Sequence, residues 1–379
     1  MLIGFANSFF AQQFELYKKV PAFAFESKEL GYDVNIEVTV PLELNQENAA
    51  SYPVIFVFDM QNSRSYNYIL TTIDYLTSNS QMPLCVVVGI EAGEGMKRYN
   101  ETQLSISDSA AYGEKNEAFI FEELLPLVRT EYHGNKHLTL IGHSRYGYFT
   151  SLLLTRRPEE LGAVISLSPF LWQGNVDVIE ELREMTKNAK PNRTVYYRFS
   201  MGEDYTEDYL TIDSMLVSGE LNSNYFDIKG ELFTAAGHTC TPGITIAPAL
   251  YGIFEFWAER QQLYFDNYNS EFEVLESIQQ EITEHYGQEL NLALGILNGK
   301  GWFFFNEAKY ELAIRAWEEM LKAYPNCSDA YLNMAYAQKE LNQDPTKMLA
   351  LFRKSLAADA FYTPEEKKEI LDGVAKEEW

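Results

Sequence analysis

The feature that most constrains the fold is an alternation between short apolar runs and longer amphipathic stretches, from about residue 30 to residue 260. This pattern is typical of strands joined by crossover helices in a mostly parallel sheet. The runs are continuously apolar, which indicates strands covered by helices on both faces. We therefore predict an α/β fold. The predicted strands are residues 54–58, 84–88, 138–141, 163–167 and 195–199, and the predicted helices are residues 118–131, 149–157, 176–187 and 246–260.

The composition changes after about residue 265, where strand signals vanish and Glu, Lys, Ala and Leu dominate. Two segments there look alike, one around Tyr310–Ala313 and one around Lys347–Ala350, at an offset of about 35 residues, close to the tetratricopeptide period. We predict a small all-α tetratricopeptide-like domain at residues 266–379, after an N-terminal segment at 1–29 and an α/β domain at 30–265. Because so few repeats need a packing partner, one hypothesis is that this domain caps the active site.

Charge and cysteine content exclude several classes of partner. The 379 residues carry a formal net charge of −25, which repels phosphate backbones and anionic lipids. No run approaches the roughly 18 apolar residues of a membrane span. Cys85, Cys240 and Cys327 lack the spacing of a disulfide framework or a zinc site. We expect no nucleic acid, no membrane span, no metal and no organic cofactor.

The first residues, Met1 to Gln13, look like the tail of a signal peptide, with an apolar stretch and then small residues but no basic region. This interpretation predicts a periplasmic or secreted protein. The alternative is an ordinary buried N-terminal strand or helix in a cytoplasmic protein.

The strongest local motif is Gly142-His-Ser144-Arg145-Tyr146-Gly147, where a predicted strand runs into a turn and then a helix. This setting is that of a nucleophile elbow, which projects a serine hydroxyl above the sheet. Ser144 is the candidate nucleophile, and the Arg145 N–H is placed to stabilise an oxyanion. The usual pattern is G-x-S-x-G, and Tyr146 departs from it. The alternative is a plain strand-to-helix turn.

A serine nucleophile needs a base, which in hydrolases of this fold comes late in the chain. His238 meets that requirement, because it lies in a loop between a predicted strand and the helix that begins near Ile246. His143 adjoins Ser144 but is expected to point to the opposite side of the chain. An isolated structural histidine is the alternative for His238.

The acid should follow the predicted strand at 195–199, where four carboxylates occur together. Asp204 is the first choice, with Glu203 and Glu207 as alternatives. Its role would be to accept the Nδ1–H of His238 and stabilise the imidazolium. An acidic surface loop is the competing interpretation.

With these residues, the chain between about 30 and 260 resembles the α/β-hydrolase esterase family that includes esterase D, feruloyl esterases and enterobactin esterases. The matching segments are Pro53–Asp59, Val88–Ile90 with Arg98–Asn100, the elbow, and the serine-proline-x-x-tryptophan element in Ser166–Trp172. The resemblance implies an α/β-hydrolase fold and ester cleavage through a Ser-His-Asp or Ser-His-Glu triad, or through a Ser-His dyad as in some siderophore esterases.

The resemblance also implies further site residues. The second oxyanion donor would be the backbone N–H of Met60, where relatives usually carry glycine. Arg98, Tyr99 and Trp172 would line the substrate pocket. Tyr146 and Met60 depart from the family pattern beside the nucleophile, so we expect Tyr146 to contribute to substrate binding and specificity, with an inactive relative as the alternative.

We therefore predict a serine carboxylic-ester hydrolase that acts on a small-molecule ester through an acyl-enzyme on Ser144. One alternative is a catalytically silent scaffold whose helical repeats bind a protein or peptide. Another is a peptidase or an acyltransferase on the same residues. The identity of the ester and the oligomeric state stay open, because specificity depends on pocket shape.

Overall fold

The computed structural model describes residues 14, 16–44, 51–106, 108, 110–266, 273–359, 361–377 and 379. The signal-peptide-like start at residues 1–13 lies outside the described residues, and so the predicted localisation stays a prediction.

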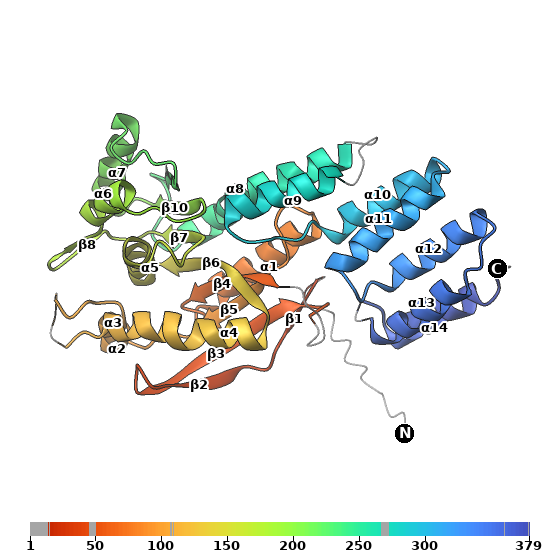
Figure 1. The fold of residues 1–379 in the computed structure, drawn as a ribbon. Helices are drawn as coiled ribbons and strands as arrows, with labels where there is room; N and C mark the ends of the chain where they lie inside the picture. Colours follow the sequence, from red (N-terminus) through yellow and green to blue (C-terminus); the bar gives the residue numbers. More distant parts are fainter. Residues whose placement is uncertain are drawn as a thin grey trace, which may run out of the picture.

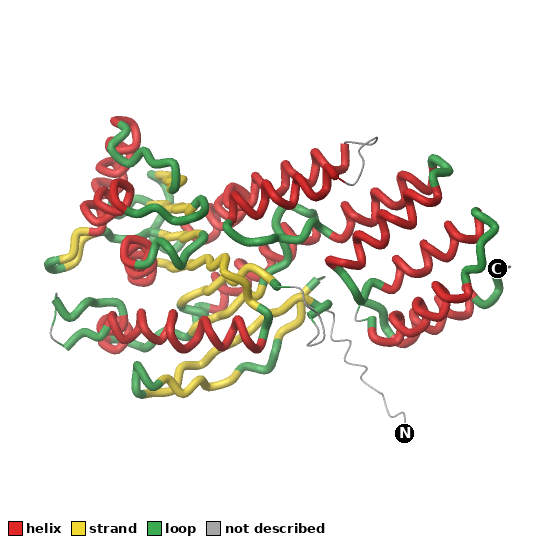
Figure 2. The backbone as a smooth tube through the Cα atoms, in the orientation of Figure 1, coloured by secondary structure: helices red, strands yellow, loops and turns green. Residues whose placement is uncertain are grey.

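A nine-stranded sheet forms the centre of the protein (Figure 1, Figure 2). Its strands are β1 (Tyr17–Lys19), β2 (Phe23–Ser27), β3 (Tyr32–Pro41), β4 (Tyr52–Phe58), β5 (Val86–Ile90), β6 (Gly134–His143), β7 (Ala163–Leu167), β10 (Val195–Met201) and β11 (Phe226–Leu232). The strand order is β1-β3-β5-β4-β6-β7-β10-β11, with β2 also paired to β3. Pairing is parallel from β5 to β11, and antiparallel where β3 meets β1, β2 and β5. The prediction of a mostly parallel sheet is confirmed.

Helices cover both faces of the sheet. They are α1 (Ser63–Ser78), α2 (Met96–Glu101), α3 (Gly113–Ala118), the π-helical segment η1 (Phe119–Leu124), α4 (Leu125–Glu131), α5 (Arg145–Arg156), α6 (Val178–Asn188), α7 (Thr206–Ser218) and α8 (Thr241–Asp266). A short hairpin of β8 (Trp172–Gln173) and β9 (Val176–Asp177) precedes α6.

Successive residues of β4 enter two different cores, because side chains alternate across a strand. Val54 and Phe56 pack with residues of α4, α5 and α6. Ile55 and Val57 pack on the other face with residues of α1 and α8. Burial on both faces explains why β4 is apolar throughout, with every residue buried.

The chain order places a crevice at one edge of the sheet. β4 and β6 are neighbours in the sheet, and the chain leaves β4 toward β5 on one side and leaves β6 toward β7 on the other. The connections at the carboxyl ends of β4 and β6 therefore run in opposite directions. Such a switch point is the common ligand site of open α/β sheets. The residues that follow these two strands are Asp59 and Ser144.

The C-terminal part of the chain is all helical, with α9 (Glu273–Tyr286), α10 (Leu294–Asn306), α11 (Tyr310–Ala323), α12 (Ser328–Glu340), α13 (Thr346–Ala358) and α14 (Pro364–Val374). The two similar segments fall at the starts of α11 and α13. The tetratricopeptide resemblance and the boundary near residue 265 stay predictions.

This helical region contacts the amino ends of the parallel strands. A cavity of about 180 Å³ at the contact is lined by Leu16, Glu43 and Met82 from the sheet side and by Leu294 and Tyr324 from the helical side. Gln261 of α8 links the two parts, because its Nε2 donates to the carbonyl of Ser80, just before β5, at 3.1 Å, and its Oε1 accepts from the Ala293 N–H at 2.6 Å. In Figure 1 the helices α10 to α14 lie on the opposite side of the sheet from α6, α7 and β8. The hypothesis that this region caps the active site is therefore wrong.

No helix among the described residues is both long enough and apolar enough to cross a membrane.

Candidate active site

Ser144 lies at a sharp turn between β6 and α5. Its backbone has φ 58° and ψ −115°, a region that non-glycine residues occupy at a cost of about 1–3 kcal/mol and mostly at functional sites. The Ser144 N–H donates to the carbonyl of Leu167 at 2.8 Å, which ties the turn to β7. A Cβ on Gly142 would lie 2.2 Å from the carbonyl oxygen of Tyr146, so glycine is required there. These contacts have the geometry of a nucleophile elbow.

The structure shows why the elbow accommodates Tyr146. The Tyr146 side chain is 2% exposed and stacks on Phe58, with ring centroids 4.7 Å apart. Its hydroxyl donates to Glu101 Oε2 at 3.1 Å. The close approach to β7 is made by Gly147, whose added Cβ would lie 3.0 Å from the Leu167 carbonyl. Tyr146 is thus a packing residue in this structure and lies outside the wall of the cavity beside the elbow, so its role in substrate binding stays a prediction.

His238 and Asp204 meet beside the elbow. The Nδ1 of His238 is hydrogen-bonded to Asp204 Oδ2. Because a carboxylate accepts, Nδ1 carries the proton and Nε2 keeps its lone pair. Among the described residues, the carboxylate hydrogen-bonded to the His238 ring is that of Asp204, whereas the alternative acids Glu203 and Glu207 have exposed side chains. Within the described residues, Ser144 Oγ and His238 Nε2 are not joined by a hydrogen bond, and such bonds often form only when substrate is present.

Three side chains donate to the backbone carbonyl of His238. His143 Nε2 lies 2.9 Å from this oxygen, and the hydroxyls of Ser168 and Thr241 each lie 3.3 Å from it. The rings of His143 and His238 have centroids 4.8 Å apart. The expectation that His143 points away from the site is therefore wrong. Ser168 belongs to the serine-proline-x-x-tryptophan element, so that element helps to hold the candidate base.

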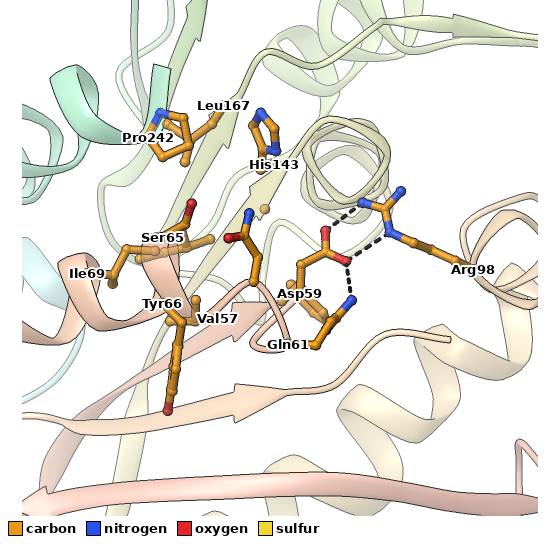
Figure 3. A pocket seen from close by; sticks show the side chains of 14 residues that line it. Val57, Asp59, Gln61, Ser65, Tyr66, Ile69, Arg98, His143, Leu167 and Pro242 are labelled. Carbon is orange, nitrogen blue, oxygen red and sulfur yellow. Dashed lines mark hydrogen bonds and ion pairs between the residues drawn. The ribbon is translucent and has the colours of Figure 1, made fainter. Parts of the chain in front are cut away.

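A cavity of about 180 Å³ opens between β4, β6 and the starts of α1 and α8. Figure 3 shows Asp59 between Arg98 and Gln61, and hydrogen-bonded to both of them. The floor is apolar, whereas His143 and Asn62 add polar groups. Ser144 does not line this cavity, which meets the elbow at His143 and Gly142. Its wall is formed by Val57, Phe58, Asp59, Gln61, Asn62, Ser65, Tyr66, Ile69, Arg98, Ile141, Gly142, His143, Leu167 and Pro242.

The two predicted oxyanion donors differ in their availability. Arg145 is the first residue of α5, so its N–H lies outside the hydrogen-bond ladder of the helix. The Met60 N–H instead donates to the carbonyl of Ile90 at 3.2 Å. The Arg145 N–H is thus the predicted oxyanion donor that the helical ladder does not use. The Met60 N–H is used in a hydrogen bond to the main chain of β5.

Of the other three residues predicted to line the substrate pocket, Arg98 lies in the cavity wall, and Tyr99 and Trp172 lie outside it. Arg98 lines the cavity and is paired with Asp59 at 2.6 Å. Tyr99 lies outside the cavity wall, with the Arg145 guanidinium 4.5 Å from its ring centroid. Trp172 is 64% exposed on the β8–β9 hairpin. Among the described residues, no group of three or more His, Cys, Asp and Glu is arranged to hold a metal ion.

The mostly parallel sheet, the strained serine at its switch point and the His238–Asp204 pair define an α/β-hydrolase. A family model described as "Putative esterase" matches residues 27–217, about half of the chain. The protein therefore belongs to this family of esterases. The matched stretch contains Ser144 and Asp204, and His238 lies beyond it. No curated protein matches the chain.

Solved structures share the fold. An IroE-like serine hydrolase from Shewanella oneidensis has a TM-score of 0.63 and 14% identity, over 80% of this chain and 98% of that one. A protein from Capnocytophaga ochracea has a TM-score of 0.58 and 15% identity, over 89% of this chain and 94% of that one. The BES protein from Bacillus cereus has a TM-score of 0.52 and 19% identity, over 62% of this chain and 96% of that one. The coverage of 89% extends the shared fold into the helical region.

Proposed function

We propose that this esterase hydrolyses carboxylic esters through an acyl-enzyme on Ser144, with His238 as general base and Asp204 as the acid that orients it. The observation that carries the proposal is the strained Ser144 at the start of α5, with the hydrogen-bonded His238–Asp204 pair beside it. A serine hydroxyl needs a neighbouring base to become nucleophilic.

The proposed reaction has two halves. In the first, His238 Nε2 takes the Ser144 proton as Oγ attacks the ester carbonyl, and it then passes that proton to the leaving alcohol. In the second, His238 takes a proton from the water molecule that attacks the acyl-enzyme, and it then gives this proton to Ser144 Oγ as the acid is released. The Arg145 N–H stabilises the oxyanion in both halves. The Met60 N–H contributes only if it leaves the Ile90 carbonyl.

Asp204 accepts Nδ1–H from His238 throughout and stabilises the imidazolium that forms in each half. Its carboxylate does not itself take the proton. The three donors on the His238 carbonyl keep the loop in place while the ring exchanges protons.

The test compares p-nitrophenyl acetate and butyrate hydrolysis by the wild type, Ser144→Ala and His238→Ala. We expect both variants to lose several orders of magnitude in kcat. Ser214→Ala is a matched control, because Ser214 is exposed on α7, and it should match the wild type. A fluorophosphonate should label the wild type stoichiometrically and leave Ser144→Ala unlabelled.

The same assays separate the competing functions. A wild type no faster than its variants, and not labelled, would leave the silent scaffold as the leading interpretation. Faster turnover of anilides than of esters would identify a peptidase, and transfer to added alcohols would identify an acyltransferase. Siderophore, feruloyl and simple acyl esters all belong in the substrate panel.

A further inference from the structure

The side chain of Arg145, the residue that follows the candidate nucleophile, is held between two aromatic rings. Its Cζ lies 4.5 Å from the ring centroid of Tyr99 and 5.2 Å from that of Phe170. Tyr99 belongs to α2, and Phe170 follows β7. Two separate segments thus fix the direction of one guanidinium, which is half-buried.

This guanidinium has no carboxylate partner among the described residues. Its Nη1 atom is buried and makes no hydrogen bond, whereas the nearby Arg98 is paired with Asp59 at 2.6 Å. Burial lowers the pKa of Arg145, and the charge of Arg98 lowers it further. A partly buried cation without a counter-charge is costly to keep. In a chain with 55 acidic residues, the absence of a carboxylate from this place indicates a site for an external anion.

Arg145 also lies close to the candidate catalytic residues. The Phe170 ring lies 6.1 Å from that of Tyr205, and the Tyr205 ring lies 6.2 Å from that of His238. The rings of Tyr205 and Phe170 thus form a series of contacts between His238 and the Arg145 guanidinium. The backbone N–H of Arg145 lies at the elbow. An ester held at Ser144 would have its flanking groups within reach of this guanidinium.

We propose that Arg145 binds a carboxylate on the substrate, so that the enzyme prefers esters carrying a carboxylate a few bonds from the scissile carbonyl. This inference rests on the proposed esterase function and names its substrate class. The bidentate donors of a guanidinium match a carboxylate, and burial strengthens such charge-assisted hydrogen bonds. The negative charge of the whole chain would repel the substrate only at long range, where salt screens it.

The test measures kcat/KM for two p-nitrophenyl esters of similar length, the neutral valerate and the glutarate monoester, which bears a free carboxylate. We expect the wild type to prefer the glutarate at least tenfold, and Arg145→Gln to reduce this ratio at least tenfold. Arg145→Lys should keep part of the preference, and 0.5 M NaCl should lower it. Arg353→Gln removes an exposed arginine from α13 and should leave the ratio unchanged.

A ratio that is near one in the wild type and the same in Arg145→Gln would overturn the inference. If valerate turnover is still lost in Ser144→Ala, the proposed esterase function survives that result. Should the wild type hydrolyse neither ester, titration calorimetry with N-phenylsuccinamate and the neutral N-phenylbutanamide decides the matter. Binding of the anion to the wild type that is lost in Arg145→Gln supports the site, and equal or absent binding rejects it.

Discussion

His143 Nε2 lies 2.9 Å from the carbonyl oxygen of His238, so the residue before the candidate nucleophile holds the main chain of the candidate base. Because a carbonyl can only accept, Nε2 carries the proton. Burial lowers the pKa of His143, which favours the neutral ring with Nδ1 as an acceptor. The elbow and the loop that carries His238 are therefore joined by a hydrogen bond.

We expect His143→Leu to lower kcat for p-nitrophenyl butyrate about fivefold with little change in KM, because one hydrogen bond of roughly 1 kcal/mol that positions His238 is lost. His143→Gln keeps an N–H donor and should recover part of the rate. Equal rates in wild type and His143→Leu, at equal stability, would remove the positioning role. A loss confined to KM would point to the cavity that His143 lines.

Asp204→Asn should lower kcat by roughly 10³- to 10⁴-fold, because an amide no longer selects the histidine tautomer or stabilises the imidazolium. The matched controls are Glu203→Gln and Glu207→Gln, which neutralise exposed carboxylates close by in the chain and should stay within threefold of wild type. The measurement is steady-state turnover of the same ester. An active Asp204→Asn would instead indicate a Ser-His dyad.

Restoring glycine at position 146 should destabilise the protein, although G-x-S-x-G is the usual elbow pattern. Tyr146→Gly removes a buried ring stacked on Phe58, which should cost about 3–5 kcal/mol in the free energy of unfolding. Tyr146→Phe removes only the hydroxyl bonded to Glu101 and should cost about 1 kcal/mol. Urea denaturation followed by circular dichroism measures both changes.

The control for this series is Tyr75→Gly, at a position in α1 that is 67% exposed. It should cost only the helix propensity of glycine, about 1 kcal/mol. A Tyr146→Gly variant as stable as the wild type would show that the ring is not part of the packed core.

Stability should fall in acid because of His137. Burial, together with the charges of Arg193 and His285, lowers the pKa of this histidine to about 3. The unfolded chain takes up the proton below its ordinary pKa of about 6.5, so the contribution of neutral His137 is complete above pH 6.5 and is lost as the pH falls toward 3. The slope is up to about 1.4 kcal/mol per pH unit.

His137→Phe should remove that slope, because phenylalanine does not titrate, and we expect its ring to pack against Phe254 and Tyr286, which contact the imidazole. The measurement is the free energy of unfolding of both proteins between pH 4 and pH 8. The difference between the two free energies of unfolding should be constant above pH 6.5. Below pH 6.5 the wild type should lose stability relative to the variant. Parallel curves across the whole range would contradict the assignment.

The sequence was sufficient to predict most of the parallel part of the sheet, because strands buried on both faces leave continuous apolar runs such as β4 and β7. The parallel strand β11 is only partly buried and leaves no such run. The helix α1 was not predicted, since its sequence is rich in Ser, Thr and Tyr, which have modest helix propensity. The antiparallel β2 is exposed at alternate residues and gives a weaker signal. The π-helical segment η1 interrupts the predicted helix at 118–131, and a 3.6-residue period does not reveal it.

For the site, chain order was enough to select Ser144, His238 and Asp204 as candidates, and the structure brings His238 and Asp204 together. Side-chain direction could not be read from the motif. Tyr146 and His143 both belong to the elbow, three positions apart, yet one side chain turns into the core and the other toward His238. Whether an amide is already engaged, as that of Met60 is, also depends on contacts between segments far apart in the sequence.

The hydrophobic core on the α1 and α8 face continues without a break from Ile55 in β4 to Trp317 and Met334 in the helical region. A shared core of this kind makes unfolding cooperative across the parts that share it. We therefore expect the helices α9 to α12, which contribute residues to this core, to unfold together with the sheet and to support it at a distance from Ser144. Damage to them should appear first as a lower melting temperature of the catalytic part, and only later as a change in what that part hydrolyses.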